Sequence, residues 1–193
     1  MVPYRRVESP ARRHSYMKTT SYFLLRTASV LTSVVIGIVG HSYADDAAVN
    51  SSDKSFMKNA AEAGMAEVKA GELAKAKSAN ADVKAFGEHM VMDHTKAGDE
   101  LKALAAAKKV ELPESPSLMQ QGKAVLLDAK TGADFDKAFA ETMVSDHKTV
   151  VDAFKKASTE ATDGDVKAFA TKTLPTLEMH LKMAEDLQNK VGR

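Results

Sequence analysis

Residues 81–104 read ADVKAFGEHMVMDHTKAGDELKAL, with apolar side chains at alternating steps of three and four. This spacing is typical of one face of an α-helix that packs against other helices. The positions on this stripe are Val83, Phe86, Met90, His94, Ala97, Leu101 and Leu104. The stretch therefore predicts a long amphipathic helix with one ionisable side chain, that of His94, on its buried face.

Similar stripes occur in three other segments, and turn-forming residues separate them. Asn80 is a candidate N-cap, Pro113 and Pro116 interrupt the middle of the chain, and Thr131-Gly132 and Asp163-Gly164 are candidate turns. We therefore predict helices at about 53–78, 81–109, 133–160 and 164–190. A short helix is predicted at about 117–129, with Ser115 as its N-cap and Pro116 at its first position.

The lengths of the connections predict how these helices are arranged. Short turns near 79–80 and 161–163 make the first two and the last two long helices antiparallel hairpins. The longer middle segment then crosses from one hairpin to the other. This connectivity predicts an all-α fold, a ferritin-like antiparallel four-helix bundle with a short helix in the central crossover.

Residues 1–44 have the pattern of a secretory signal peptide. Six basic residues precede an apolar run at 28–39, and Ser42 and Ala44 supply the small side chains of a cleavage site. We expect cleavage after Ala44 and a periplasmic or secreted protein, and Met17 is an alternative start that would omit residues 1–16. The alternative is an uncleaved membrane anchor. Residues 45–52 are predicted to be a flexible leader to a bundle domain at 53–191.

The composition beyond Ala44 excludes several classes of function. This part of the chain carries 21 basic and 25 acidic residues, a net charge of −4, with no basic cluster. We therefore expect no nucleic-acid partner and, after signal cleavage, no membrane span. The sequence has no cysteine, which excludes cysteine nucleophiles, iron–sulfur clusters and cysteine-ligated zinc fingers. The sequence identifies no catalytic residues, and it leaves protein partners unknown.

One ionisable residue lies on the stripe of each long helix: Glu67, His94, His147 and His180. Counted from the hairpin turns, their positions differ by only one or two helical turns, so they could meet at mid-bundle. Imidazoles and a carboxylate are ordinary ligands for zinc, iron, manganese or copper. The sequence therefore predicts one metal site made by these four residues. Asp93 and Asp146 precede two of the histidines and either orient an imidazole or face water.

Three other interpretations of these residues stay open. The four side chains could form a metal-free polar network that sets helix packing in a structural or interaction module. Met90, Met143 and Met183 lie one turn from the histidines, which would suit copper or haem, although methionine at this spacing is more often core filler. An oxidoreductase that uses the metal with oxygen or peroxide is the third. The motif Glu-x-x-His is absent, which argues against a standard di-iron ferroxidase.

Several segments resemble a known bacterial family. KAFGEHMVMDH (84–94) and KAFAETMVSDH (137–147) share the pattern Met-Val-x-Asp-His, and FATKTLPTLEMHLKMAEDL (169–187) carries Leu-Pro-Thr-Leu-x-x-His. Together with residues 60–113, they resemble the family called domain of unknown function 4142. The resemblance implies a secreted ferritin-like bundle, often described as a membrane or outer-membrane protein. It implies Glu67, His94, His147 and His180 as the family's polar positions, without an established activity. From the residues themselves we expect a protein that binds one metal ion there, with a role in envelope stress or metal handling.

Overall fold

The computed structural model describes residues 48–192, in which all regular secondary structure is helical. The helices are α1 (Ser51–Lys77), α2 (Ala81–Ala107), α3 (Leu118–Asp128), α4 (Gly132–Glu160) and α5 (Gly164–Val191). The all-α prediction is confirmed, and every predicted helix boundary agrees within two residues. The predicted signal peptide lies outside the described residues. Between residues 48 and 192, no helix has a stretch long and apolar enough to cross a bilayer.

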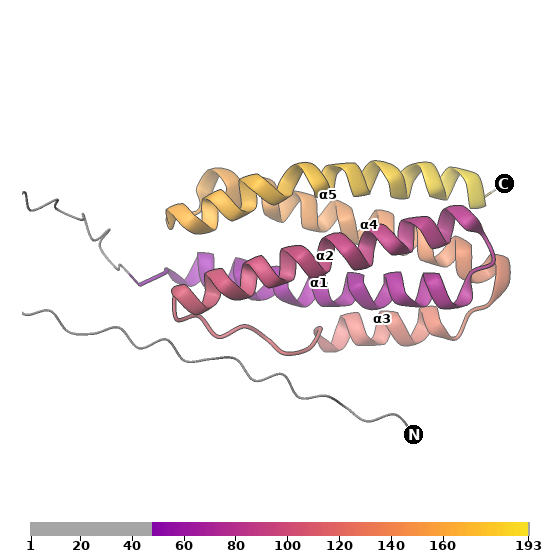
Figure 1. The fold of residues 1–193 in the computed structure, drawn as a ribbon, viewed down its shortest axis with the longest axis horizontal. Coiled ribbons are helices and arrows are strands. Elements are labelled where there is room, and N and C mark those ends of the chain that lie inside the picture. The colour runs from indigo at the N-terminus through magenta and orange to yellow at the C-terminus, as the bar shows by residue number, and fades with distance from the viewer. Residues whose placement is uncertain (1–47, 193) are drawn as a thin grey trace, which may run out of the picture. The chain divides into compact units, whose positions relative to one another are not determined.

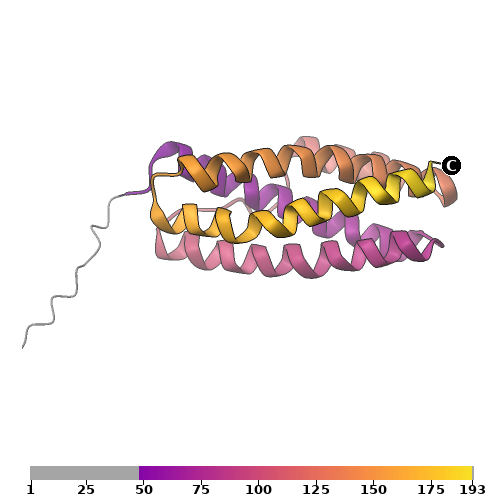
Figure 2. The ribbon, with the colours of Figure 1, turned by 90° about the horizontal axis from the view of Figure 1, so that it is seen from above.

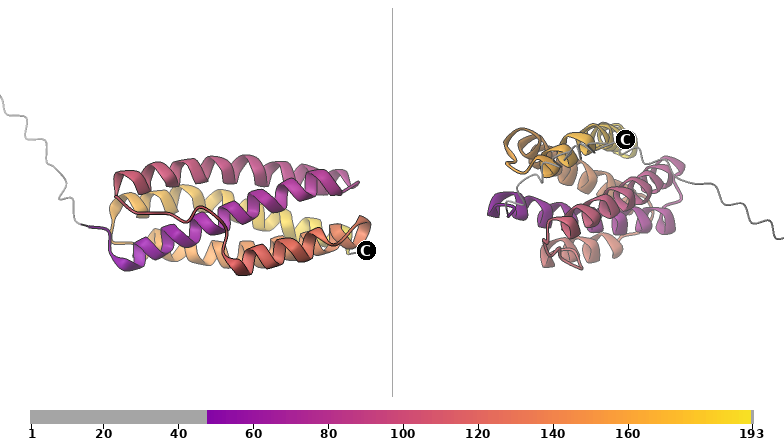
Figure 3. Two further views of the ribbon diagram at one scale, coloured as in Figure 1. Left: turned by 90° about the horizontal axis from the view of Figure 1, so that it is seen from below. Right: turned by 60° about the vertical axis from the view of Figure 1, so that its left-hand side comes forward.

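The four long helices lie side by side as two hairpins (Figures 1 and 2). The most extensive packing is within the pairs α1–α2 and α4–α5, while α1 also packs on α4 and α2 on α5. The short helix α3 lies outside this group, against α1 and α4 (Figures 1 and 3). Each long helix therefore contacts two others, and all four contribute side chains to one interior.

Polar side chains fix where several helices begin. Asn80 caps α2 as predicted, because its side chain accepts from the amides of Asp82 and Val83. The predicted cap of α3 is wrong. Ser117 replaces Ser115 because Ser117 and Gln120 form a reciprocal capping box, which satisfies two backbone amides at once. Of the predicted leader, residues 48–50 have no regular structure, but Val49 is buried.

A buried polar layer divides the apolar interior into two clusters. One cluster extends along α1 and α5 from Met57 and Val166 toward the layer, and the other begins beyond it. In every long helix the change from one cluster to the other occurs at a buried ionisable residue. These positions are Glu67 on α1, His94 on α2, His147 on α4 and His180 on α5. The four polar residues that the sequence singles out therefore share one level of the interior.

Two glycines bring the backbones of helices α1 and α2 into contact. A Cβ atom on Gly71 would lie 2.6 Å from the carbonyl oxygen of Gly87, and one on Gly87 would lie 2.8 Å from that of Gly71. On the same two helices, a Cβ atom on Gly64 or Gly98 would meet nothing within 4 Å. The helices are therefore in backbone contact on one side of the polar layer and leave open space on the other.

Asp53 ties the start of α1 to the turn between α4 and α5. Its carboxylate is buried and accepts from the amides of Thr162 and Asp163 and from the hydroxyl of Thr162. We expect Asp53→Ala to lower the free energy of unfolding by about 3 kcal/mol, because it removes three part-buried hydrogen bonds to one buried carboxylate. Urea denaturation measures the effect.

Asp82 provides the matched control for this prediction. It also lies in the first turn of a helix, but it is 56% exposed in its ion pair with Lys190. Asp82→Ala should therefore cost no more than about 1 kcal/mol, as exposed ion pairs do. Equal losses in the two variants would contradict the role given to Asp53.

Candidate metal centre

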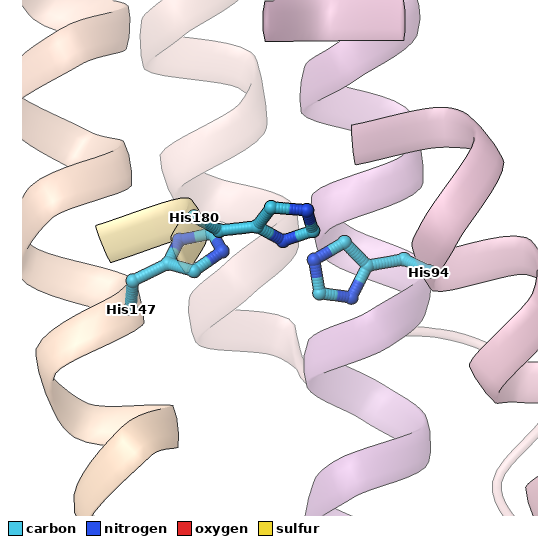
Figure 4. Close-up of side chains that lie close together, drawn as sticks. All are labelled: His94, His147 and His180. Carbon is cyan, nitrogen blue, oxygen red and sulfur yellow. The ribbon is translucent and has the colours of Figure 1, made fainter. Parts of the chain in front are cut away.

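The three buried histidines come from three different helices and point toward one another (Figure 4). The ring centroids of His94 and His180 are 5.3 Å apart, those of His147 and His180 are 5.6 Å apart, and those of His94 and His147 are 5.7 Å apart. The rings thus form a nearly equilateral triangle. His94 comes from the first hairpin, and the other two come from the second, so the group lies where the hairpins meet.

One nitrogen of each ring faces an oxygen acceptor. His94 Nδ1 lies 3.0 Å from Glu67 Oε2, and His180 Nε2 lies 3.0 Å from Asp93 Oδ2. His147 Nδ1 lies 3.0 Å from the carbonyl oxygen of Met143, one turn earlier on its own helix. A carbonyl or an ionised carboxylate can only accept, so each of these nitrogens must carry the proton.

The other nitrogen of each ring is buried and has no hydrogen-bond partner. These atoms are His94 Nε2, His147 Nε2 and His180 Nδ1. Since the opposite nitrogen is the donor, a neutral ring presents a lone pair at this atom. One ligand atom from each of the three residues lies within 4.8 Å of the other two. Nitrogens bound to one tetrahedral ion are ~3.4 Å apart, so small movements of the rings suffice for shared coordination.

Such a pattern is the one found around metal-binding histidines. In these sites one ring nitrogen binds the ion, and the other donates to a carboxylate or a backbone carbonyl that fixes the tautomer and the ring's direction. Each of the three histidines has one ring nitrogen that faces such an acceptor and one buried nitrogen that has no hydrogen-bond partner. A buried group of three lone pairs without donors is also unfavourable unless a cation or a proton occupies the space between them. The arrangement can therefore hold a metal ion.

Glu67 lies beside the histidines, on the side of their protonated nitrogens. Its side chain is 3% exposed, with Oε2 3.0 Å from His94 Nδ1 and Oε1 3.6 Å from His147 Nδ1, and neither oxygen accepts a well-aligned hydrogen bond. The two nitrogens of an imidazole point in different directions, so this carboxylate does not converge with the lone pairs. The four predicted site residues are brought together, with three of them facing inward and Glu67 behind two rings.

The charge states of these residues follow from burial and from their mutual contacts. Burial alone would raise the pKa of Glu67, but His94 first, and then His147 and His180, lower it. Burial alone would lower the pKa of His94, but the charge of Glu67 and the hydrogen bond with it outweigh burial and raise it. Glu67 is therefore ionised and stabilises positive charge on or beside His94.

The remaining two histidines are held neutral. Burial is the main cause that lowers the pKa of His147, and the charge of Glu67 opposes it only in part. Burial and the nearby His94 lower the pKa of His180 to about 4. Two of the three rings are therefore neutral at physiological pH. Metal binding needs neutral imidazoles, so an ion would have to compete with a proton at His94 alone.

The two aspartates that precede histidines have different surroundings. Asp93 holds His180, which lies on another helix, and so it fulfils the prediction that it orients an imidazole. Asp146 instead pairs with Lys123 on α3 at 2.6 Å, and its charge is only the weakest of the causes that act on the pKa of His147. The shared Asp-His sequence does not distinguish them, because the difference depends on which helix each aspartate faces.

The methionines next to the histidines pack in the apolar interior. Met90 and Met143 are fully buried in the cluster that contains Phe86 and Phe139. This placement is the one expected of core filler. Phe86 also lies against two rings of the site, with centroids 6.4 Å from His147 and 6.3 Å from His180. That contact was not predicted, because an apolar stripe does not tell which ring a phenylalanine will touch.

Comparison with known proteins identifies a family but no activity. A family profile described as "Domain of unknown function (DUF4142)" matches residues 40–187. No curated protein and no solved structure matches the chain. The match covers most of the chain and every residue of the histidine site. The protein therefore belongs to the DUF4142 family.

Proposed function

We propose that this protein binds one transition-metal ion through His94 Nε2, His147 Nε2 and His180 Nδ1. The observation that carries the proposal is the convergence of three buried ring nitrogens without partners, each on a ring whose other nitrogen faces an acceptor. Glu67 and Asp93 then act as acceptors that orient the rings and balance the charge of the ion. In this proposal Glu67 is therefore not a fourth ligand of the ion.

The ligand set favours some ions over others. Imidazole suits zinc, copper and iron, whereas manganese prefers oxygen ligands. Three histidines also leave one position open on a tetrahedral ion. We propose that the ion is zinc, copper or iron. The protein would then have a role in metal handling or envelope stress. Export to the periplasm follows in this proposal from the basic and apolar N-terminal sequence.

We further propose a ferritin-like relationship for the fold. The long connection between two antiparallel hairpins supports it, as does a polar layer at the middle of the helices. The relationship carries no iron chemistry by itself, because one fold hosts many functions.

A metal-free network is the second candidate, and the Glu67–His94 pair favours it. With a proton on both ring nitrogens, His94 would be positively charged and would pair with Glu67. Its Nε2 would then donate a hydrogen bond to a neutral neighbouring histidine. Such a network would fix the alignment of the helices without any ion. The two candidates differ in what a chelator does to the folded protein.

Metal content and thermal stability test the proposal. The protein, purified without a polyhistidine tag, should contain one ion per chain, measured by mass spectrometry of the metals. Removal of the ion should lower the melting temperature by about 10 °C, because bound ligand at 1,000 times its Kd stabilises by about 4 kcal/mol. His147→Ala should abolish loading, while His89→Ala on α2, outside the polar layer, should not. Metal well below one per chain with an unchanged melt would reject the proposal.

A further inference from the structure

A cleft of about 670 Å³ lies between α1, α2 and the segment that follows α2. It occupies the part of the hairpin where the two helices leave open space. Small residues form one part of its lining: Ala60, Ala63, Gly64, Ala97 and Gly98. Apolar side chains such as Leu101, Leu112 and Phe154 form another part, and Glu67 and His94 line it as well. The cleft thus joins an apolar surface to the histidine site.

Size and chemistry distinguish this cleft from its neighbours among residues 48–192. Clefts that bind small molecules usually measure about 300–1,000 Å³ and combine apolar walls with a few polar groups. A second cleft of about 630 Å³, on the other side of α1, reaches Glu67 but none of the three histidines. A third reaches His94 and His180 but measures only about 100 Å³. Of these three, the cleft of about 670 Å³ combines room for a ligand with a histidine of the site.

A buried polar atom without a partner indicates where a ligand would be recognised. His94 lines the cleft and is 6% exposed, and its Nε2 has no hydrogen-bond partner. A metal ion on this nitrogen, shared with His147 and His180, would keep one coordination position free. Val150 and Leu177, one turn from His147 and His180, also line the cleft, so a molecule in the cleft lies on one side of the histidine layer.

Charge selects the head group of such a molecule. The carboxylates of Glu67 and Asp93 already balance a divalent ion held by three neutral imidazoles. An anionic head would leave a net negative charge in a buried site, which is costly, whereas a neutral head adds none. Charged side chains such as Lys69, Glu72 and Lys102 also belong to the lining, but most of its surface is apolar, so the body of the molecule is expected to be apolar.

We infer that the α1–α2 cleft binds a small apolar molecule through one neutral nitrogen head, of the azole type, that completes the coordination of the metal. The inference rests on the proposed metal site. It assigns to that site a class of ligand that is aromatic or alkyl in its body and uncharged at its head.

Calorimetry with a probe molecule and two of its fragments tests the two parts of this inference, the apolar body and the nitrogen head. The probe is 4-phenylimidazole, compared with imidazole, which lacks the apolar body, and with toluene, which lacks the head. We expect 4-phenylimidazole to bind the metal-loaded protein at least about tenfold more tightly than either fragment, since it uses both the walls and the ion. Removal of the ion should reduce its affinity to that of toluene.

A variant that fills the cleft supplies the second measurement. Gly98 lies one turn beyond His94, and helical side chains lean toward the N-terminus, so Gly98→Leu should project toward His94. The position is open and leucine favours helix, so the variant should fold. Its affinity for 4-phenylimidazole should fall at least about tenfold while its metal content is unchanged. Gly122→Leu on α3, which is also open but does not line the cleft, is the matched control.

Metal content, measured first on the same samples, separates the two levels of failure. A wild-type protein that does not load metal overturns both the proposed function and this inference. A protein that loads metal but binds 4-phenylimidazole no more tightly than imidazole overturns the inference alone. Unchanged binding by Gly98→Leu has the same consequence, because the probe would then lie elsewhere.

Discussion

Gly71→Ala is expected to lower the free energy of unfolding by about 3 kcal/mol, the upper part of the range for overpacked cores. The added methyl group would lie 2.6 Å from the carbonyl oxygen of Gly87 and 2.9 Å from the Cβ of Met90. These are a backbone atom and the first atom of a buried side chain, and neither can rotate away. Helices α1 and α2 would have to separate beside the buried polar layer.

The same helices provide controls of opposite sign. Gly64→Ala and Gly98→Ala place the methyl group in open space and should raise the free energy of unfolding by about 0.5–1 kcal/mol each, because alanine favours helix. Urea denaturation of the three variants gives the comparison. A stabilising effect of Gly71→Ala would show that the backbones are not in contact. The double variant Gly71→Ala, Gly87→Ala should lose less stability than the sum of the two single losses. Both substitutions force apart the same backbone contact, so separation of the helices for one also makes room for the other.

Asp93→Asn is expected to weaken metal binding about 10–100-fold, the usual effect of removing a group that orients a metal ligand. The carboxylate holds Nε2 of His180 in its protonated form and so directs the Nδ1 lone pair inward. An amide removes the negative charge and can present its own donor to this nitrogen. Competition with a chelator of known affinity measures the change.

Asp146→Asn is the matched control, because Asp146 has the same place before its histidine. Its partner is Lys123, and both side chains reach solvent, at 25% and 44% exposure. Its replacement should leave metal affinity unchanged. If the two variants lost affinity equally, the effect would be one of general charge rather than of ring orientation.

The apolar stripes explain why the helices could be predicted so closely. Each long helix buries one stripe, and a stripe interrupted by Glu67, His94, His147 or His180 marks where the interior becomes polar. Turn residues such as Asn80 then set the boundaries. The cap of α3 was misplaced because Ser115 and Ser117 are both good caps alone, and only the reciprocal bond of Ser117 with Gln120 separates them.

The inner geometry of the site could not be predicted from the stripes. Helical periodicity tells which face a histidine lies on, but not which ring nitrogen points inward. That choice depends on acceptors from elsewhere, such as Asp93 for His180 and the Met143 carbonyl for His147. The sequence also does not show which glycine on α1 is in close contact. Gly64 and Gly71 differ only in what the neighbouring helix places opposite them.

The position of the histidine group between the hairpins has a consequence for how the chain is held together. His94 belongs to the α1–α2 hairpin, and His147 and His180 belong to the α4–α5 hairpin. An ion bound by all three would cross-link the hairpins and close loops of more than thirty residues each, which restricts the unfolded chain much as a disulfide does. In a protein without cysteine, three imidazoles and one ion would thus provide the cross-link that a disulfide provides elsewhere.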